Sequence, residues 1–278
     1  MNDPVTMRRK LRGELKRLRT TQGFTQRYVA ERLDWSQSKI IRIENGSVAI
    51  GVTDLRALLQ LYRLEDDGAV AALEDMARGS KRQPFAAHKD VVSAETLRFW
   101  GYSLSASIIR QVEPLVVPGL LQTEEYARAL LAGYGIDPER IEKIWEARSE
   151  RQEILEQSEL PEMFFILDEA AIRRMVGGEN VMKRQLARLV ELNSRPRLTV
   201  QVIAFEVGAH KAMRGPFVYL EFPEADDPDV LYLENASGDS VFRDDPDVTG
   251  DYLEDFLKLE TLASPPQDLE KALALVDH

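Results

Sequence analysis

The sequence predicts a mainly α protein with an α+β part: an N-terminal bundle of five helices, then a larger α+β domain with a mostly antiparallel sheet. Three observations lead to this prediction. Apolar residues recur at helical spacing through residues 1–78. A polar segment that contains a proline, residues 79–90, interrupts the pattern. Beyond Pro161, short apolar runs typical of strands follow one another with few helices between them, which favours antiparallel pairing.

The length of 278 residues suits roughly two domains, and the hydrophobic content of 44% can fill a core in each. We expect a helical domain over residues 1–78, a linker over 79–90 and an α+β domain over 91–278. The chain contains no cysteine, which excludes disulfides and thiolate metal sites. No apolar run reaches the roughly 20 residues that cross a bilayer, and the N-terminus has no secretory apolar core, so we expect a soluble, cytoplasmic protein without membrane contact.

The first helix is expected over residues 7–22, and Gly23 ends it. Its apolar face carries Met7, Leu11, Leu15 and Leu18, while arginines and lysines crowd the other faces. A basic helix face is often only solvated. Its position ahead of the next two helices makes part of it a candidate for phosphate contact.

Residues 25–46 read as two short helices joined by a turn. Thr25 and Ser36 are N-cap candidates, and Asn45–Gly46 is a stop because glycine accepts the left-handed conformation. Each cap is followed by apolar residues spaced for one buried face: Val29, Ala30 and Leu33, then Ile40 and Ile43. Only Asp34 and Trp35 lie between the helices. The pattern is that of a helix-turn-helix.

The second of these helices carries polar groups that indicate a function. With Ile40 and Ile43 buried, four polar side chains point outward: Gln37, Ser38, Lys39 and Arg42. Glutamine can bond adenine in bidentate fashion, arginine or lysine can bond guanine, and serine is permissive, so this face suits base edges in a DNA groove. The alternative is a pair of amphipathic helices with a solvated polar face.

Two further helices complete the first domain, one capped by Thr53–Asp54 and one over about residues 69–78. Charge separates this domain from the rest. Residues 1–64 hold 13 basic and 6 acidic side chains, a net charge of +7, whereas residues 65–278 carry −18 of the overall −11. A basic head suits phosphate binding, and an acidic body keeps non-specific DNA binding weak.

Residues 25–46 resemble the Xre and phage-repressor family of helix-turn-helix proteins. The family pattern appears as Thr25-Gln26, Val29-Ala30, Asp34-Trp35-Ser36 and Ile40-Ile41-Arg42-Ile43-Glu44-Asn45-Gly46, with Trp35 an unusual turn residue. The resemblance implies that Gln26 touches a phosphate, that Gln37, Ser38 and Arg42 read bases, and that Glu44 pairs internally with Arg19. The expected DNA-binding residues are Gln26, Ser36, Gln37, Ser38, Lys39, Arg42 and Asn45.

In the second domain a helix is expected from Ser93 through Ile109, followed by an extended stretch between Pro114 and Pro118. Thr123 caps a helix that reaches Leu131, and Asp137 opens another to about residue 157. Strands are expected at 163–167, 198–205, 217–222, 230–234 and 238–242, and helices from Asp168, over 180–193 and over 249–263.

The second domain offers little catalytic chemistry. It has no phosphate-binding glycine-rich loop, no G-x-S-x-G elbow and no H-E-x-x-H motif, and its histidines stand apart. Glu169 is better explained as helix-start charge than as a general base. We expect no catalytic residue, no metal site and no cofactor. The loop 205–217, with His210, Lys211 and Arg214, is a candidate to line a pocket or contact a partner.

Nearly the whole chain resembles the actinobacterial WhiJ-like Xre regulators. The motifs that carry this resemblance are PGLLQTEEYARALL (118–131), ERQEIL (150–155), ILDEAAIRRMVGG (166–178), QLARLVEL (185–192) and GPFVYLEF (215–222). The resemblance implies a transcriptional regulator without enzymatic activity, whose acidic domain receives a signal through a small BldB-like partner protein. Residues 101–107 are poorer in acids than the family pattern, so no partner-binding residue is assigned.

These features predict a sequence-specific regulator that binds double-stranded DNA as a homodimer and acts as a repressor. Two alternatives stay open. The helical head could bind protein as an adaptor, or the second domain could be an enzyme that the motifs do not reveal.

Overall fold

A computed structural model describes residues 4–44, 48–80, 84–157, 161–223, 228–234 and 240–274. The chain divides into two compact units, Met1–Pro84 and Phe85–His278. This division falls inside the segment that the sequence assigns to a linker. Phe85 is buried, and its ring meets that of Trp100 edge-on at 5.5 Å between centroids. Residues 85–90 therefore fold with the second unit, because an aromatic side chain anchors them there.

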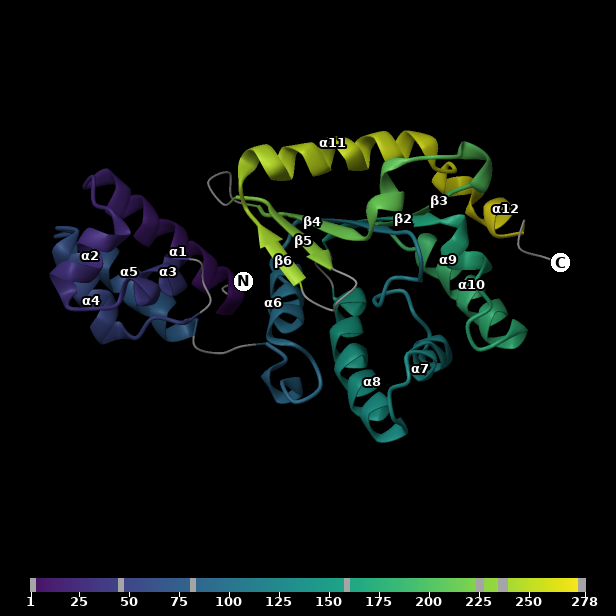
Figure 1. Cartoon of the computed structure of the whole chain (residues 1–278), viewed down its shortest axis with the longest axis horizontal. Coiled ribbons are helices and arrows are strands. Elements are labelled where there is room, and N and C mark those ends of the chain that lie inside the picture. The colour runs from purple at the N-terminus through teal and green to yellow at the C-terminus, as the bar shows by residue number, and fades with distance from the viewer. Residues whose placement is uncertain are drawn as a thin grey trace. The chain divides into compact units, whose positions relative to one another are not determined.

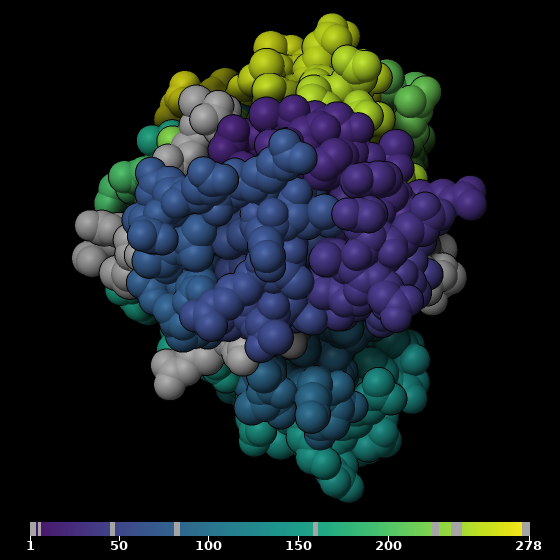
Figure 2. All heavy atoms as spheres, turned by 90° about the vertical axis from the view of Figure 1, so that its left-hand side faces the viewer, coloured from purple at the N-terminus to yellow at the C-terminus, as the bar shows by residue number. Residues whose placement is uncertain are grey.

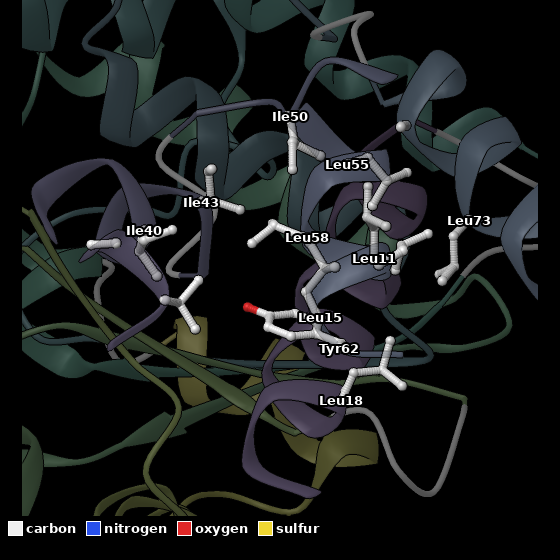
Figure 3. Close-up of a cluster of buried hydrophobic side chains, with 14 residues drawn as sticks. Leu11, Leu15, Leu18, Ile40, Ile43, Ile50, Leu55, Leu58, Tyr62 and Leu73 are labelled. Atoms are coloured by element: carbon white, nitrogen blue, oxygen red, sulfur yellow. The ribbon is translucent and has the colours of Figure 1, made fainter. Parts of the chain in front are cut away.

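The first unit contains the five helices expected from the sequence: α1 (Pro4–Thr21), α2 (Gln26–Leu33), α3 (Gln37–Glu44), α4 (Val52–Leu61) and α5 (Asp67–Gly79) (Figure 1). One apolar core joins them (Figure 3), and its buried members include Leu11, Leu15, Leu18, Ile40, Ile43, Leu55, Leu58, Tyr62 and Leu73. Each helix contributes one apolar face to this core, as the helical spacing of these residues predicts.

The turn between α2 and α3 is fixed by local hydrogen bonds. The Thr25 side chain accepts from the Tyr28 N–H and caps α2, and the Ser36 Oγ accepts from the Lys39 N–H at 3.2 Å. Between them Asp34 adopts the left-handed conformation with φ of 55°. The cap predicted for α4 differs: Gly51 is its N-cap, so Thr53 and Asp54 already lie in its first turn.

The second unit is built on one mixed sheet of the order β3-β2-β1-β4-β5-β6. Its strands are β1 (Ile108–Glu113), β2 (Glu162–Asp168), β3 (Leu198–Ile203), β4 (Phe217–Glu221), β5 (Val230–Glu234) and β6 (Ser240–Arg243). β1 pairs in parallel with β2, as β2 does with β3, and the three other pairings are antiparallel. The fold class predicted from the sequence, a helical bundle followed by an α+β domain, is confirmed.

Strand β1 replaces the end of a predicted helix. The helix α6 (Ala94–Ser103) ends before Ile108 and Ile109, which begin β1 instead. Ile108 keeps helical spacing from Trp100 and Leu104, and this spacing made the prediction wrong. Long-range pairing decides the outcome, since the Ser107 N–H donates to the Glu221 carbonyl and the Ser107 carbonyl accepts from Glu162, each at 2.8 Å.

Helices cover both faces of the sheet (Figure 1). The helix α11 (Pro246–Leu262) lies along one face, and its Phe256 and Leu259 pack with Val112 and Ile166 of the sheet. The other face carries α6, α7 (Glu124–Gly133), α8 (Pro138–Gln152) and α10 (Glu179–Asn193), and two short helices, α9 (Glu169–Arg173) and α12 (Leu269–Ala274), complete the unit. No helix among the described residues has the length and apolar character needed to cross a membrane.

We predict that Leu55→Ala lowers the free energy of unfolding of the first unit by about 2–5 kcal/mol, because it leaves a cavity in a packed core. Leu55 is 0% exposed. Amide hydrogen exchange of α1 to α5 in the full-length protein measures the loss. The matched control is Ile41→Ala, which truncates an exposed side chain and should cost less than about 1 kcal/mol. Equal losses from both variants would contradict this description of the core.

Candidate nucleic-acid interface

The helix α3 exposes the polar face that the sequence predicts. Ile40 and Ile43 are buried in the core of the first unit, whereas Gln37, Ser38 and Arg42 are exposed. Figure 2 shows the face of the first unit that is turned to the viewer, where atoms of both its purple and its blue segments lie at the surface. The helix thus presents hydrogen-bonding side chains outward from a rigid apolar base.

Among the described residues, the Arg42 side chain is held by one weak hydrogen bond. Its Nε donates to the Ser38 carbonyl at 3.4 Å, a long hydrogen bond, and its side chain is otherwise directed along an exposed helix face. A guanidinium has five N–H donors in a planar fork, so Arg42 retains the pair of donors that a guanine edge requires.

Lys39 is engaged more than the sequence suggests. Its Nζ lies 2.8 Å from Asp54 Oδ2 at the start of α4, and 3.6 Å from the centroid of the Trp35 ring. An ion pair and a cation–π contact together hold the ammonium against its own domain. Trp35, the unusual residue of the turn, is therefore a platform for this lysine and also packs against the apolar core.

Gln26 is likewise engaged within the domain. Its Nε2 donates to Glu44 Oε2 at 2.8 Å. One amide proton is used in this bond, and a glutamine amide has two, so the second can still donate to a phosphate. The bond orients the side chain at the first position of α2.

Glu44 is the centre of a buried polar network that joins three helices. Arg19 of α1 donates to both carboxylate oxygens of Glu44, from Nε at 2.6 Å and from Nη2 at 3.0 Å. Arg19 Nη1 also donates to the Phe24 carbonyl at 2.7 Å. The hydrogen bond to Glu44 raises the pKa of Arg19, and burial raises that of the neighbouring Tyr62 phenol. The pair that the resemblance implies is thus present, with Gln26 as a third member.

Two predicted DNA-binding residues remain, Ser36 and Asn45, and the structure describes only the first. Ser36 is exposed, and its oxygen caps α3 while its hydroxyl proton stays available to a phosphate. Asn45 lies outside the described residues. Of the described side chains that sequence reasoning passed over, Ile41 is 40% exposed on α3 and can contact a thymine methyl group. The sequence could have indicated Ile41, because it is an apolar residue of α3 that does not belong to the buried face.

Basic side chains on neighbouring helices extend the positive surface. Lys16 and Arg32 are exposed, while Arg17 pairs with Glu14 and Arg27 pairs with Glu31 at 2.9 Å, both at the surface. Exposed ion pairs of this kind contribute about 0–1 kcal/mol, so a phosphate can displace the acid. Among the described residues, no group of three or more histidines and acids is arranged to hold a metal ion.

Two family models match this chain. A helix-turn-helix domain matches residues 10–73. A domain of unknown function, DUF5753, matches residues 98–274. No curated protein and no solved structure matches the chain.

We predict that Glu44→Gln lowers the free energy of unfolding of the first unit by about 3–5 kcal/mol, because it leaves the Arg19 charge buried without its partner. The double variant Arg19→Met with Glu44→Leu should be less destabilised than Glu44→Gln, since it removes both charges. Hydrogen exchange of α1 to α3 gives the three free energies. A double variant that loses as much stability as Glu44→Gln would contradict the unpaired Arg19 charge as the cause of the loss.

Proposed function

The chain belongs to the DUF5753 family, and we propose that its helix-turn-helix domain binds DNA in a sequence-specific manner to regulate transcription. One observation carries this proposal: α3 is anchored by buried Ile40 and Ile43 and turns Gln37, Ser38 and Arg42 to the outside. A recognition helix needs this combination, because it must enter the major groove as a rigid body with its polar side chains leading.

Each residue receives a role from its chemistry. Gln37 is suited to adenine, Arg42 to guanine, and Ser38 accepts either. Ile41 adds an apolar contact beside them. Gln26 and Ser36, whose side chains are held at the starts of α2 and α3, are placed to donate to phosphates on either side of the groove.

The wider proposal includes a symmetric assembly and a signal. We propose a homodimer that occupies two half-sites one helical turn apart, roughly 34 Å, and represses transcription. The resemblance to WhiJ-like Xre regulators supports this role, with the second unit sensing a signal or binding a small BldB-like partner protein. The proposal assigns no catalytic activity to the second unit. The alternative is an adaptor that binds protein through α3. Unchanged DNA binding after substitutions on the exposed face of α3 would favour this alternative.

We predict that Arg42→Ala and Gln37→Ala each weaken binding at the preferred site by about 1–3 kcal/mol and relax the preference at one base pair. Selection from a randomised DNA pool, followed by titration of the selected and scrambled duplexes, measures both effects. The reason is that each side chain reads one base edge. If Arg42→Ala weakens every sequence equally, Arg42 is not a base reader.

Lys16→Ala provides the contrasting control for base readers. Lys16 is exposed on α1, and a lysine that meets only phosphate should weaken binding to all sequences alike and reduce the salt slope by about one. Titrations at several salt concentrations measure the slope. A change in sequence preference without a change in slope would move Lys16 from the backbone to a base edge.

We predict that Asp54→Asn strengthens binding to all DNA sequences by about 1 kcal/mol, because it frees the Lys39 ammonium and removes a negative charge beside α3. Glu65→Gln, which neutralises another exposed acid of the same unit, is the matched control and should have a smaller effect. Combining Asp54→Asn with Lys39→Ala should abolish most of the gain. A full gain without Lys39 would refute the ion pair as its cause.

A further inference from the structure

A cavity of about 930 Å³ opens at one edge of the sheet in the second unit. The strands β1, β2, β3 and β5 run in the same direction, so their carboxyl ends meet at this edge. Glu113, Asp168 and Glu234, which line the cavity, are the last residues of β1, β2 and β5. Ligands in open sheets of this kind bind beyond the carboxyl ends of the strands, near the strand where the order reverses, which here is β1.

One wall of the cavity is formed by apolar side chains that are exposed to solvent. Leu115, Tyr134, Phe205 and Met213 all line it, and each is 54–65% exposed. They come from segments far apart in the chain, yet they gather around one opening. The volume and this lining match those of small-molecule sites, which combine an apolar body with a few polar groups.

The polar groups of the lining are mainly acidic. Among the described lining residues, the ionisable groups are the carboxyls of Glu113, Asp168 and Glu234, the basic side chains of His210 and Arg214, and the phenol of Tyr134. Arg214 is exposed. Three carboxyls therefore face one exposed guanidinium and one histidine, which favours a ligand that brings positive charge and hydrogen-bond donors.

One end of the cavity holds two carboxyls close enough to repel each other. The Gln111 Nε2 donates to Glu113 Oε1 at 2.9 Å, and the Tyr232 hydroxyl donates to Glu234 Oε1 at 2.9 Å. Burial, with a further contribution from the Glu234 charge, raises the pKa of Glu113 to about 8. An ammonium group between these acids would favour the ionised form of both.

Two arginines of α8 stand behind this end and do not belong to the described lining. Arg148 donates to Gln122 Oε1 at 2.6 Å, and the Arg151 guanidinium lies over the Phe99 and Trp100 rings. Burial and the charge of Arg148 lower the pKa of Arg151 to about 9. The Arg151 charge partly opposes the rise in the pKa of Glu113, and the carboxyls of Glu113 and Glu234 still line the cavity.

The other end holds an acceptor without a partner. His210 Nε2 lies 3.1 Å from Asp168 Oδ2, and the His210 side chain is only 3% exposed. Within the described part of the chain, its buried Nδ1 has no hydrogen-bond partner. When Nε2 donates to the carboxylate, Nδ1 is an acceptor, and such an atom calls for a donor from elsewhere.

We propose that this cavity binds a small organic cation with an apolar body, of the primary amine class, and that this ligand is the signal of the regulator. The apolar body packs on the wall of Leu115, Tyr134, Phe205 and Met213, and the ammonium donates to Glu113 and Glu234. The aromatic rings of Tyr134 and Phe205 add cation–π attraction at the opening. The role as a signal rests on the proposed function, whereas ligand binding itself does not.

The test compares ligands that differ only in the charged group. Full-length protein without DNA is titrated by calorimetry and by ligand-observed NMR with 2-phenylethylamine, 2-phenylethanol and phenylacetate, and with hexylamine, hexanol and hexanoate. We expect each amine to bind about tenfold or more tightly than its alcohol and its acid, because a charge-assisted hydrogen bond is lost in both. Equal binding of the three forms, tighter binding of the acid, or no binding of either amine overturns the proposal.

Variants locate the site. Glu113→Gln with Glu234→Gln should remove the tenfold preference for amines, and Glu139→Gln, which neutralises an exposed acid of α8, should leave it unchanged. Thermal unfolding without ligand shows whether the double variant is folded, and Phe205→Ala, which alters only an exposed wall residue, is a second route if it is not. Phe205→Ala should weaken each amine about tenfold. Unchanged amine binding in both variants overturns the site.

A separate measurement addresses the signal. DNA binding is titrated with and without saturating 2-phenylethylamine, and we expect at least a fivefold change in affinity if the two sites are coupled. Failure of the protein to bind any DNA contradicts the proposed function alone. Amine binding without an effect on DNA affinity contradicts the role as a signal and retains the site.

Discussion

The buried ion pair between Arg19 and Glu44 is the interaction on which the geometry of the first unit depends. Glu44 ends α3, Arg19 lies near the end of α1, and Gln26 begins α2, so one carboxylate ties three helices. A buried carboxylate must have partners, which allows few arrangements of these helices. The apolar core drives the packing of the helices, and the polar network specifies the orientation and register of α3 within it. The exposed face of α3 can be used for recognition only because this register is fixed.

The exposed face of α3 combines a side chain that is bound within the domain with one that is nearly unbound. Within the described part of the chain, the Arg42 side chain makes one long hydrogen bond, whereas Lys39 is bound by Asp54 and Trp35. A constrained lysine loses less entropy when it meets a phosphate, but it must first give up its ion pair. Asp54 therefore acts as an internal competitor for DNA. Under the proposed function, this competition weakens attachment to all DNA sequences alike, and base contacts of Arg42 and Gln37 would set the preference among them.

The sequence predicted the first unit well because its structure is local. Thr25 and Ser36 cap the helices expected from them, and Ile40 and Ile43 are buried as their spacing indicates. Apart from the cap of α4, the main failures have one cause, which is dependence on residues far along the chain. Ile108 and Ile109 form a strand because 162–167 and 217–221 pair on either side. The Lys39–Asp54 pair and the wall of the cavity, from Leu115 to Met213, also combine residues that no short pattern connects. Of the residues that line the cavity, only the loop 205–217 was indicated by the sequence, through its basic residues.

The position of β1 in the sheet has a consequence for biosynthesis. β1 is made early in the second unit, but both of its neighbours, β2 and β4, are made much later. Closing these long segments is entropically slow, whereas the helices of the first unit need only partners within the first 80 residues. On the ribosome we expect the first unit to fold while the hydrogen-bonding edges of β1 stay unpaired until residue 221 leaves the exit tunnel. During that interval the nascent chain carries a folded helix-turn-helix domain and an unfolded second unit.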